Sequence, residues 1–150
     1  MIRNARLEDV PTLVEIGRVM HAEGQYAAYN FDEAKLRREI DALIELDQGI
    51  ALVSEENGHV VGGFIGMVHE HFFGHDKVSY DQALFLLPQH RSGFQGMKLI
   101  KEYISQAKDK GAAQITIANS TGFEMDKVAS LYERLGFEHV GYVFTMRAVQ

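Results

Sequence analysis

The sequence predicts an α/β fold of the α+β kind, in which helices pack on a mixed sheet. Segments with helical spacing alternate with β-rich segments: a strand, two helices, three strands, a helix, a strand, a helix and a final strand pair. The strand-helix-strand units require some parallel pairing, and Asn57-Gly58 between two β-rich segments predicts an antiparallel hairpin. No linker or repeat divides the 150 residues, so we expect a single domain over residues 1–150.

Two capped helices follow a short strand formed by the first five residues, MIRNA. The first helix is predicted over residues 7–23, with Asp9 as its cap. A loop over residues 24–30 then leads to a second helix over 31–47, for which Asp32 is the predicted cap. The apolar residues recur at helical spacing: Leu7, Val10, Leu13, Val14, Ile16 (or Gly17) and Met20 in the first helix, and Leu36, Ile40, Leu43, Ile44 and Leu46 in the second.

The remaining elements alternate between strands and helices that end at glycines. A glycine after the last turn of a helix accommodates the left-handed backbone that commonly ends it. The expected elements are strands over 50–55, 59–71 and 77–87, a helix over 96–110 closed by Gly111, a strand over 112–120, a helix over 124–136 ended by Gly136, and a strand pair over 137–149 turning near Gly141.

Composition excludes several classes of function. The formal net charge of −6 argues against a nucleic-acid binder that is held mainly by phosphate contacts. Because the chain has no cysteine, disulfides, thiolate nucleophiles and zinc-thiolate sites are excluded. The start MIRNARLEDV has no apolar core of a signal peptide, and no apolar run approaches the ~20 residues of a membrane span. We therefore expect a cytoplasmic protein with no nucleic-acid or membrane partner.

The segment LFLLPQHRSGFQGMKLI, residues 84–100, carries the clearest functional signal. An apolar strand stops at Pro88, and a loop containing glycines leads directly into a helix, whose N-terminal amides attract anions such as phosphate. A P-loop is excluded because Gly96 is followed by Met97 and Lys98, and the glycines of a dinucleotide fingerprint are incomplete. A pyrophosphate loop of an acyl-CoA enzyme and a plain strand-to-helix turn both remain open.

Two motifs together resemble the GCN5-related N-acetyltransferase (GNAT) family over essentially the full chain. The first is Arg91-Ser92-Gly93-Phe94-Gln95-Gly96 before the helix start MKLI, and the second is LYERLGF, residues 131–137. The resemblance implies a GNAT-like, mostly antiparallel central sheet flanked by about four helices. It also implies an acyltransferase (EC 2.3.1) that transfers an acetyl group from acetyl-CoA to a primary amine by direct attack in a ternary complex.

The sequence departs from the family pattern at two places. The middle loop glycine of the family aligns with Phe94, and Gly93 lies one position early, so the turn is expected to be rearranged; a positive φ would strain a phenylalanine. The family often has Asn seven residues before its motif tyrosine, where this chain has Met125. Asn119, at the end of its strand, is the expected replacement.

The resemblance assigns the cofactor-binding residues and a general acid. The backbone before the loop would pair with the pantetheine arm, and the loop amides, with the arginine side chain, would hold the pyrophosphate. Tyr132 matches the family tyrosine that protonates the departing thiolate; the alternative is a tyrosine that packs its helix on the sheet. The implied cofactor-binding residues are Leu84, Phe85, Leu86, Arg91, Ser92, Gly93, Phe94, Gln95, Gly96 and Asn119.

The general base and the acceptor site rest on weaker signals. Asp81, ten residues before the loop arginine, is the preferred base, and a surface strand residue is the alternative. The hairpin HEHFFGHD, residues 69–76, is rich in histidine, but no partner pattern completes a metal site, so none is expected. Glu23, Tyr26 and Tyr29, on a loop expected to face this hairpin, are predicted to bind a cationic amine.

Two other functions remain open at this stage. One is a catalytically inactive acyl-CoA-binding or interaction module, and the other is an acetyltransferase that acts on a protein partner. Exposure of Phe72 and Phe73 would favour the protein acceptor. The acceptor is thus a small-molecule or peptide amine, and a homodimer is possible because dimers are common in the family. The absence of cysteine excludes a cysteine acyl-enzyme.

Overall fold

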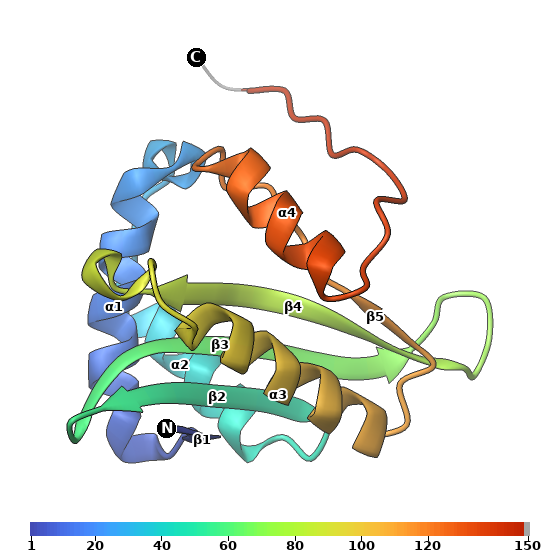
Figure 1. The fold of residues 1–150 in the computed structure, drawn as a ribbon, viewed down its shortest axis with the longest axis horizontal. Helices are drawn as coiled ribbons and strands as arrows, with labels where there is room; N and C mark the ends of the chain where they lie inside the picture. Colours follow the sequence, from blue (N-terminus) through green and yellow to red (C-terminus); the bar gives the residue numbers. More distant parts are fainter. Residues whose placement is uncertain (149–150) are drawn as a thin grey trace.

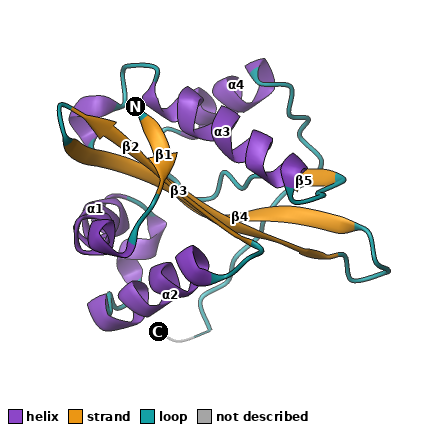
Figure 2. Cartoon of the chain, turned by 90° about the horizontal axis from the view of Figure 1, so that it is seen from below, coloured by secondary structure: helices purple, strands orange, loops and turns teal. Residues whose placement is uncertain are grey.

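A computed structural model describes residues 1–148 as a single five-stranded sheet covered on both faces by helices. The strands are β1 (Ile2–Asn4), β2 (Gly49–Glu56), β3 (His59–Glu70), β4 (Lys77–Leu86) and β5 (Gln114–Thr116). The helices are α1 (Val10–Glu23), α2 (Glu33–Glu45), α3 (Gln95–Asp109) and α4 (Met125–Arg134), with 3₁₀ turns η1 (Leu7–Asp9), η2 (Gln25–Ala28) and η3 (Pro88–His90). Helices α1 and α2 cover one face of the sheet, and α3 and α4 lie on the other (Figures 1 and 2).

The strand order β1-β2-β3-β4-β5 confirms the mixed, mostly antiparallel sheet. The first three pairings are antiparallel, and β5 joins β4 in parallel. The predicted hairpin turn between β2 and β3 is confirmed, since Asn57 and Gly58 have φ values of 52° and 79°. Two positive φ values in a two-residue turn match the right-handed twist of the flanking strands.

The core consists of two apolar clusters, one on each face of the sheet. Phe85, from β4, packs with residues of α1 and α2, including Leu13 and Ile40. On the opposite face, Phe64 stacks on Tyr103 of α3 with ring centroids 4.1 Å apart. Alternate residues of a strand point to opposite faces, so the central strands serve both clusters.

A glycine in β3 makes room for the buried tyrosine of α3. A Cβ atom at Gly66 would lie 2.3 Å from the hydroxyl oxygen of Tyr103. That hydroxyl donates to the Tyr80 carbonyl at 2.9 Å and bonds Ser79 Oγ at 2.6 Å. The tyrosine thereby fixes α3 against β3 and β4, close to where β4 and β5 separate.

The predicted helix boundaries are largely confirmed, with one exception at the start of α1. The Asp32 carboxylate accepts from the Lys35 amide at 2.9 Å, as a capping residue does. Asp9 stands at the capping position of α1 but makes no capping bond to it. Its carboxylate instead accepts from the Arg3 guanidinium, through bonds of 2.7 and 2.9 Å, and from the Arg6 amide at 2.8 Å, so both oxygens are engaged before α1 begins.

The predicted C-terminal strand pair over 137–149 is wrong for residues 137–148, which contain no strand. Residue 149 lies outside the described residues. The period-two pattern is present, but a strand also needs a neighbouring edge, and this segment leaves α4 without pairing to β5 (Figure 1). Five large apolar side chains are therefore exposed: Val140, Tyr142, Val143, Phe144 and Met146. None of the helices within residues 1–148 is long and apolar enough to cross a membrane.

Candidate active site

The site begins where β4 and β5 separate. Their register contains three pairs, the last of which joins Tyr80 to Thr116. Strand β4 then continues to Leu86, paired with β3 on one side and without β5 on the other. A β-bulge occurs at the same level, because the pairing of β3 with β4 shifts between Ile65 and Gly66. Bulges bend a strand and change its twist. The result is a split between a long β4 and a short β5 (Figure 1).

The edge of β4 beyond Tyr80 has no partner strand and faces this split. The Leu87 amide donates to the Val61 carbonyl at 2.9 Å and therefore points toward β3. Since peptide groups alternate in direction along a strand, those of Phe85 also face β3, whereas those of Leu84 and Leu86 face the split. Of the three predicted pantetheine contacts, two thus have backbone groups on the free edge.

Asp81 and Tyr132 meet in the split at a single residue of the chain that follows β5. The Asp81 carboxylate accepts from the Ala118 amide at 2.9 Å. The Tyr132 hydroxyl donates to the Ala118 carbonyl at 3.4 Å. The residues predicted as base and acid, which come from β4 and α4, are therefore brought together by one peptide segment.

Burial alters the acidity of both groups. It raises the pKa of Asp81, and the hydrogen bond from the Ala118 amide opposes that rise. Burial, and secondarily the negative charge of Asp81, also raises the pKa of Tyr132. Tyr132 consequently keeps its proton near neutral pH and can donate it. Its ring also contacts Phe137, with centroids 5.9 Å apart, so a packing role accompanies any chemical one.

The loop after β4 ends at the N-terminus of α3. Phe94 has a φ of −90°, so the strain that a positive φ would impose on it does not occur. The Lys98 amide makes the first bond of the helix, to the Phe94 carbonyl at 2.9 Å, which leaves the preceding helical amides without partners inside the helix. Added Cβ atoms at Gly93 and Gly96 would meet nothing within 4 Å, so the backbone is accessible there.

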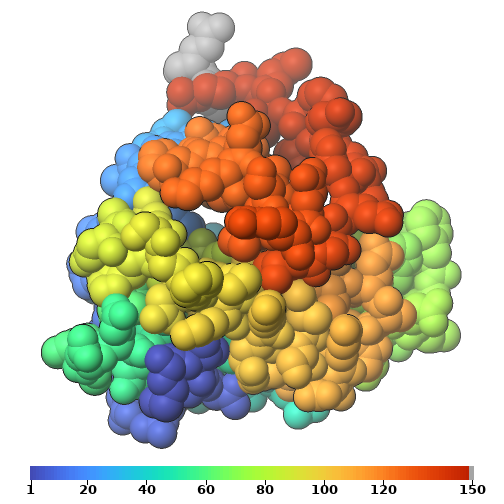
Figure 3. Space-filling view, in the orientation of Figure 1, coloured from blue at the N-terminus to red at the C-terminus, as the bar shows by residue number. Residues whose placement is uncertain are grey.

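A pocket of about 480 Å³ lies in front of these amides. Lys98, a cation, lines it and suits an anionic ligand, and His90 in the same lining contacts the Glu56 carboxylate at 2.6 Å. Sequence reasoning missed both residues, although a lysine in the first turn of the helix was a readable signal. The full lining is Glu56, Gln89, His90, Ser92, Gly93, Phe94, Gln95 and Lys98. Figure 3 shows an opening between this loop, in yellow, and α4, in orange.

Gln95 and Asn119 use their side chains within the protein. Gln95 Oε1 accepts from Ser54 Oγ at 2.8 Å, which attaches the start of α3 to β2. Asn119 Nδ2 donates to the Met125 carbonyl at 2.9 Å and so supports the first residue of α4. Both therefore hold the walls of the split in place.

Arg91 and Glu23, predicted for the cofactor and the acceptor respectively, are paired with each other. Arg91 Nη2 lies 2.7 Å from Glu23 Oε2. Arg91 Nε donates to the Leu86 carbonyl at 2.8 Å, and the guanidinium carbon lies 5.6 Å from the centroid of the Phe123 ring. The guanidinium thus connects the end of α1, the end of β4 and the loop before α4.

The loop after α1 is attached to the loop before α4. The Gln25 amide donates to the Thr121 carbonyl at 2.8 Å, and the Tyr26 hydroxyl bonds Ser120 Oγ at 2.8 Å. Sequence reasoning missed Gln25, Ser120 and Thr121, because polar loop residues carry no pattern that reveals their distant partners. Tyr29 lies on the same loop and is exposed.

The hairpin predicted over residues 69–76, whose turn is residues 71–76, does not face this loop, and that prediction is wrong. The hairpin joins the far ends of β3 and β4, whereas the loop lies toward the end of β4 that contains Leu86 (Figure 1). The histidines of the hairpin have local contacts, including His69 stacked on Tyr80 at 5.3 Å. Within the described part of the chain, no three histidine, aspartate or glutamate side chains gather as a metal site would require.

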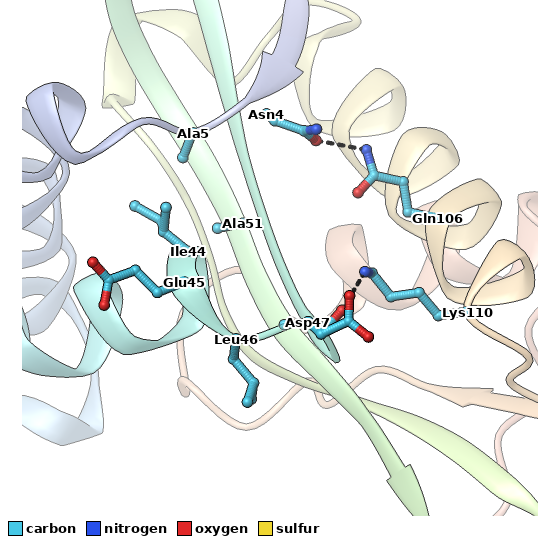
Figure 4. Close-up of a pocket in the computed structure, with 10 residues that line it drawn as sticks. Asn4, Ala5, Ile44, Glu45, Leu46, Asp47, Ala51, Gln106 and Lys110 are labelled. Carbon is cyan, nitrogen blue, oxygen red and sulfur yellow. Dashed lines mark hydrogen bonds between the residues drawn. The ribbon is translucent and has the colours of Figure 1, made fainter.

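A second pocket, of about 380 Å³, lies at the opposite edge of the sheet (Figure 4). Its polar side chains satisfy one another: Gln106 Nε2 donates to Asn4 Oδ1 at 2.7 Å, and the Lys110 ammonium donates to the Asp47 carbonyl. It lies at the C-terminal ends of α2 and α3 and has no helix N-terminus that could hold an anion, so the split is the candidate active site.

The GNAT acetyltransferase domain model matches residues 47–139, which contain the split, the loop before α3 and α4. The chain belongs to the GNAT acetyltransferase family. This membership confirms the predicted fold and the enzyme class, an N-acetyltransferase among the acyltransferases. A comparison with curated proteins finds no match.

Solved structures with the same fold include several acetyltransferases. An aminoglycoside acetyltransferase from an uncultured soil metagenomic sample is 24% identical with a TM-score of 0.72, and the match covers 99% of this chain and 98% of the other. A predicted acetyltransferase with acetyl-CoA from Clostridium acetobutylicum is 18% identical with a TM-score of 0.75, covering 98% and 95%. An aminoglycoside antibiotic 6'-N-acetyltransferase from Acinetobacter haemolyticus is 14% identical with a TM-score of 0.74, covering 100% and 99%. At these identities the likeness concerns the fold.

Proposed function

We propose that this GNAT protein transfers the acetyl group of acetyl-CoA to a primary amine by direct attack in a ternary complex. The observation that supports this most strongly is the free edge of β4, which runs from Asp81 toward the N-terminus of α3. A ligand with an amide-containing arm followed by a pyrophosphate would match the free strand edge with its arm and the helix N-terminus with its pyrophosphate. The free peptide groups would pair with the arm, and the helix amides would hold the anion.

The cofactor would be held by backbone first and by charge second. The peptide groups of Leu84 and the amide of Leu86 are available to the pantetheine arm, while the Leu86 carbonyl already accepts from Arg91 Nε. Lys98 and the amides at the start of α3 suit the phosphates, and Arg91 lies at the same end of the split. Strand pairing uses the peptide groups, so the side chains of Leu84 and Leu86 can still pack in the apolar cluster that includes Tyr103 of α3.

The proposed chemistry forms a C–N bond and breaks a C–S bond. A neutral amine attacks the thioester carbonyl carbon, and the tetrahedral intermediate expels the CoA thiolate. Tyr132, whose pKa is raised by burial, donates a proton to that thiolate. Asp81, whose raised pKa makes it a stronger base than a solvated carboxylate, takes the proton that the amine loses, directly or through water. The proton that Tyr132 gives up is restored from solvent.

The acceptor is proposed to carry positive charge. The net charge of −6 favours the approach of cations, and Glu23 and the two tyrosines of the adjacent loop lie near the end of the split. Aminoglycosides, which two of the structural neighbours acetylate according to their names, belong to this class. Polyamines and basic peptides belong to it as well.

A protein acceptor is a second candidate, supported by one observation. Phe72 and Phe73 at the tip of the β3–β4 hairpin are 92% and 87% exposed. Exposed aromatic pairs are common at protein interfaces. Because Asp81 lies only a few residues along β4 from this hairpin, a bound protein could contact both the tip and the split.

The test is a thiol-release assay with acetyl-CoA and a panel of amines. The panel contains an aminoglycoside, a polyamine, free amino acids and basic peptides, and each is compared with its N-acetylated form as a blocked control. We expect amine-dependent thiol release with at least one cationic member. Tight CoA binding without transfer to any amine or peptide would instead indicate an inactive binding module.

A further inference from the structure

One ion pair connects the part of the site expected to hold the cofactor with the part expected to hold the acceptor. Arg91 Nη2 and Glu23 Oε2 are 2.7 Å apart, and the side chains are only 21% and 24% exposed. At this depth water screens the charges poorly, and a carboxylate left without its partner would be costly. Whatever binds to either residue therefore affects the other.

Glu23 needs a cation at its position. It is the last residue of α1, where the carbonyl groups of the helix end create a partial negative charge that disfavours a carboxylate. Among the described residues, Arg91 is the basic group within salt-bridge distance of Glu23. If Arg91 moved to another partner, Glu23 would favour any other cation that could reach it.

Arg91 binds one anion, Glu23, and its chain neighbours line the pocket in front of α3. Its Nε bonds the Leu86 carbonyl on the free edge of β4, which fixes the base of the guanidinium. Its Nη2 bonds Glu23, while Nη1 has no bond to another described residue. The loop that Arg91 begins lines the pocket in front of α3. The neighbouring residues His90 and Ser92 line that pocket, so a change of the Arg91 side-chain conformation is the movement that an exchange of partners would require.

We propose that the Glu23–Arg91 pair is an exchange switch that couples cofactor binding to acceptor binding. Before CoA binds, Arg91 neutralises Glu23. When CoA binds, Arg91 pairs with a phosphate oxygen, and the uncovered Glu23 carboxylate then receives the ammonium group of a cationic acceptor. This inference rests on the proposed function and adds a requirement on the acceptor. The acceptor must have one cationic group, which stays charged beside Glu23, and a second amine, which is neutral and reacts.

The sign of the coupling follows from the exchange. CoA makes Glu23 available to a cation, and a cation at Glu23 frees Arg91 for CoA, so each ligand strengthens the binding of the other. Linkage requires both enhancements to be equal in magnitude. A diamine or polyamine satisfies the requirement, whereas a monoamine with no second charge does not.

The first test is the affinity for CoA, measured by titration calorimetry on the wild type, Glu23→Gln and Glu33→Gln. Glu33 is the matched control, because it is paired with Arg18 at 2.7 Å, and its substitution removes the same charge from an exposed pair of α1 and α2. In Glu23→Gln no ion pair must be broken, so we expect CoA to bind about fivefold more tightly or better. Glu33→Gln should match the wild type.

The second test is a crystal structure of the CoA complex. The exchange predicts an Arg91 guanidinium bonded to a phosphate oxygen and more than 4 Å from Glu23, in contrast to the 2.7 Å between Arg91 Nη2 and Glu23 Oε2 in the present structure. An intact pair with CoA bound, or CoA affinity in Glu23→Gln that is equal to or weaker than in the wild type, would overturn the switch alone. If the wild type does not bind CoA at all, the proposed function fails together with the switch.

Discussion

Replacing Tyr132 with phenylalanine separates a chemical role from a packing role. The hydroxyl makes one long hydrogen bond, 3.4 Å to the Ala118 carbonyl, so its loss should cost less than about 1 kcal/mol of folding stability. In a chain of this size that corresponds to a fall in melting temperature of about 2–4 °C at most. The ring and its contact with Phe137 remain.

Turnover should respond very differently. If the hydroxyl protonates the departing thiolate, Tyr132→Phe should lower kcat by about 10²–10⁴-fold, the range for a lost general acid. The affinity for CoA should stay within about twofold of the wild type, since the ring still fills its space. Tyr132→Ala serves as the comparison, because it also removes the ring and should cost about 2–4 kcal/mol of stability through the cavity.

The assay is thiol release with the acceptor found in the amine panel, combined with thermal unfolding of each variant. Wild-type turnover in Tyr132→Phe, with loss of activity only in Tyr132→Ala, would refute the acid role and leave Tyr132 as a packing residue. A parallel loss of stability and turnover in Tyr132→Phe would show that the hydroxyl matters for structure.

Three further predictions test the split and its surroundings. Burial raises the pKa of Asp81, so ionisation of its carboxyl lowers the free energy of unfolding. This destabilisation is absent below the unfolded pKa of about 3.9 and grows as pH rises through the folded pKa. Asp81→Asn should therefore melt higher than the wild type at pH 7 and equally at pH 3.5, with lower turnover; a lower melting temperature at pH 7 would contradict this. Gly96→Val should weaken CoA binding at least tenfold by blocking the approach to the helix amides, while the melting temperature changes little, because nothing lies within 4 Å of an added Cβ; unchanged affinity in calorimetry would mean that this loop is an ordinary turn. Gly66→Ala should destabilise the protein by about 2–4 kcal/mol in chemical unfolding, because the added Cβ would lie 2.3 Å from the Tyr103 hydroxyl and 2.5 Å from the Tyr80 carbonyl; a loss below about 0.5 kcal/mol would show that Tyr103 can move aside.

The features predicted correctly from the sequence depend on local signals. Asn57-Gly58 determines its turn by the φ values that those two residues accept, and Asp32 caps a helix three residues away. Gly111 and Gly136 end α3 and α4 with φ values of 88° and 93°. In each case the residues that make the feature are neighbours in the chain.

The features that sequence reasoning missed depend on contacts between distant segments. The strand pattern of residues 137–148 is real, but pairing requires an edge, and the pattern contains no information on whether one is within reach. Aspartate is a residue type that commonly caps helices, yet the Asp9 carboxylate is bound by Arg3 of the neighbouring strand β1. The hairpin over 71–76 was placed beside the wrong loop because strand direction, and not sequence order, determines which loops meet.

The candidate site likewise has features that local motifs predicted and features that depend on contacts between distant segments. The two sequence motifs indicated Arg91, the glycine-containing loop and Tyr132 as site residues, and these do surround the split. The meeting of Asp81 with Tyr132 runs through the backbone of Ala118, and a backbone contact has no side-chain signature in a sequence. The ion pair of Arg91 with Glu23 joins residues that were assigned to separate ligands, so only the structure could connect them.

The proposed position of CoA along the free edge of β4 can be measured by residue-resolved amide hydrogen exchange with NMR. At saturating CoA, the amides of Leu84 and Leu86 should exchange more slowly by about tenfold or more, since they gain partners. The Phe85 amide, which already faces β3, and the amides of the hairpin over 71–76 should keep their rates. Saturating CoA with no slowing at Leu84 and Leu86 would show that the cofactor binds elsewhere.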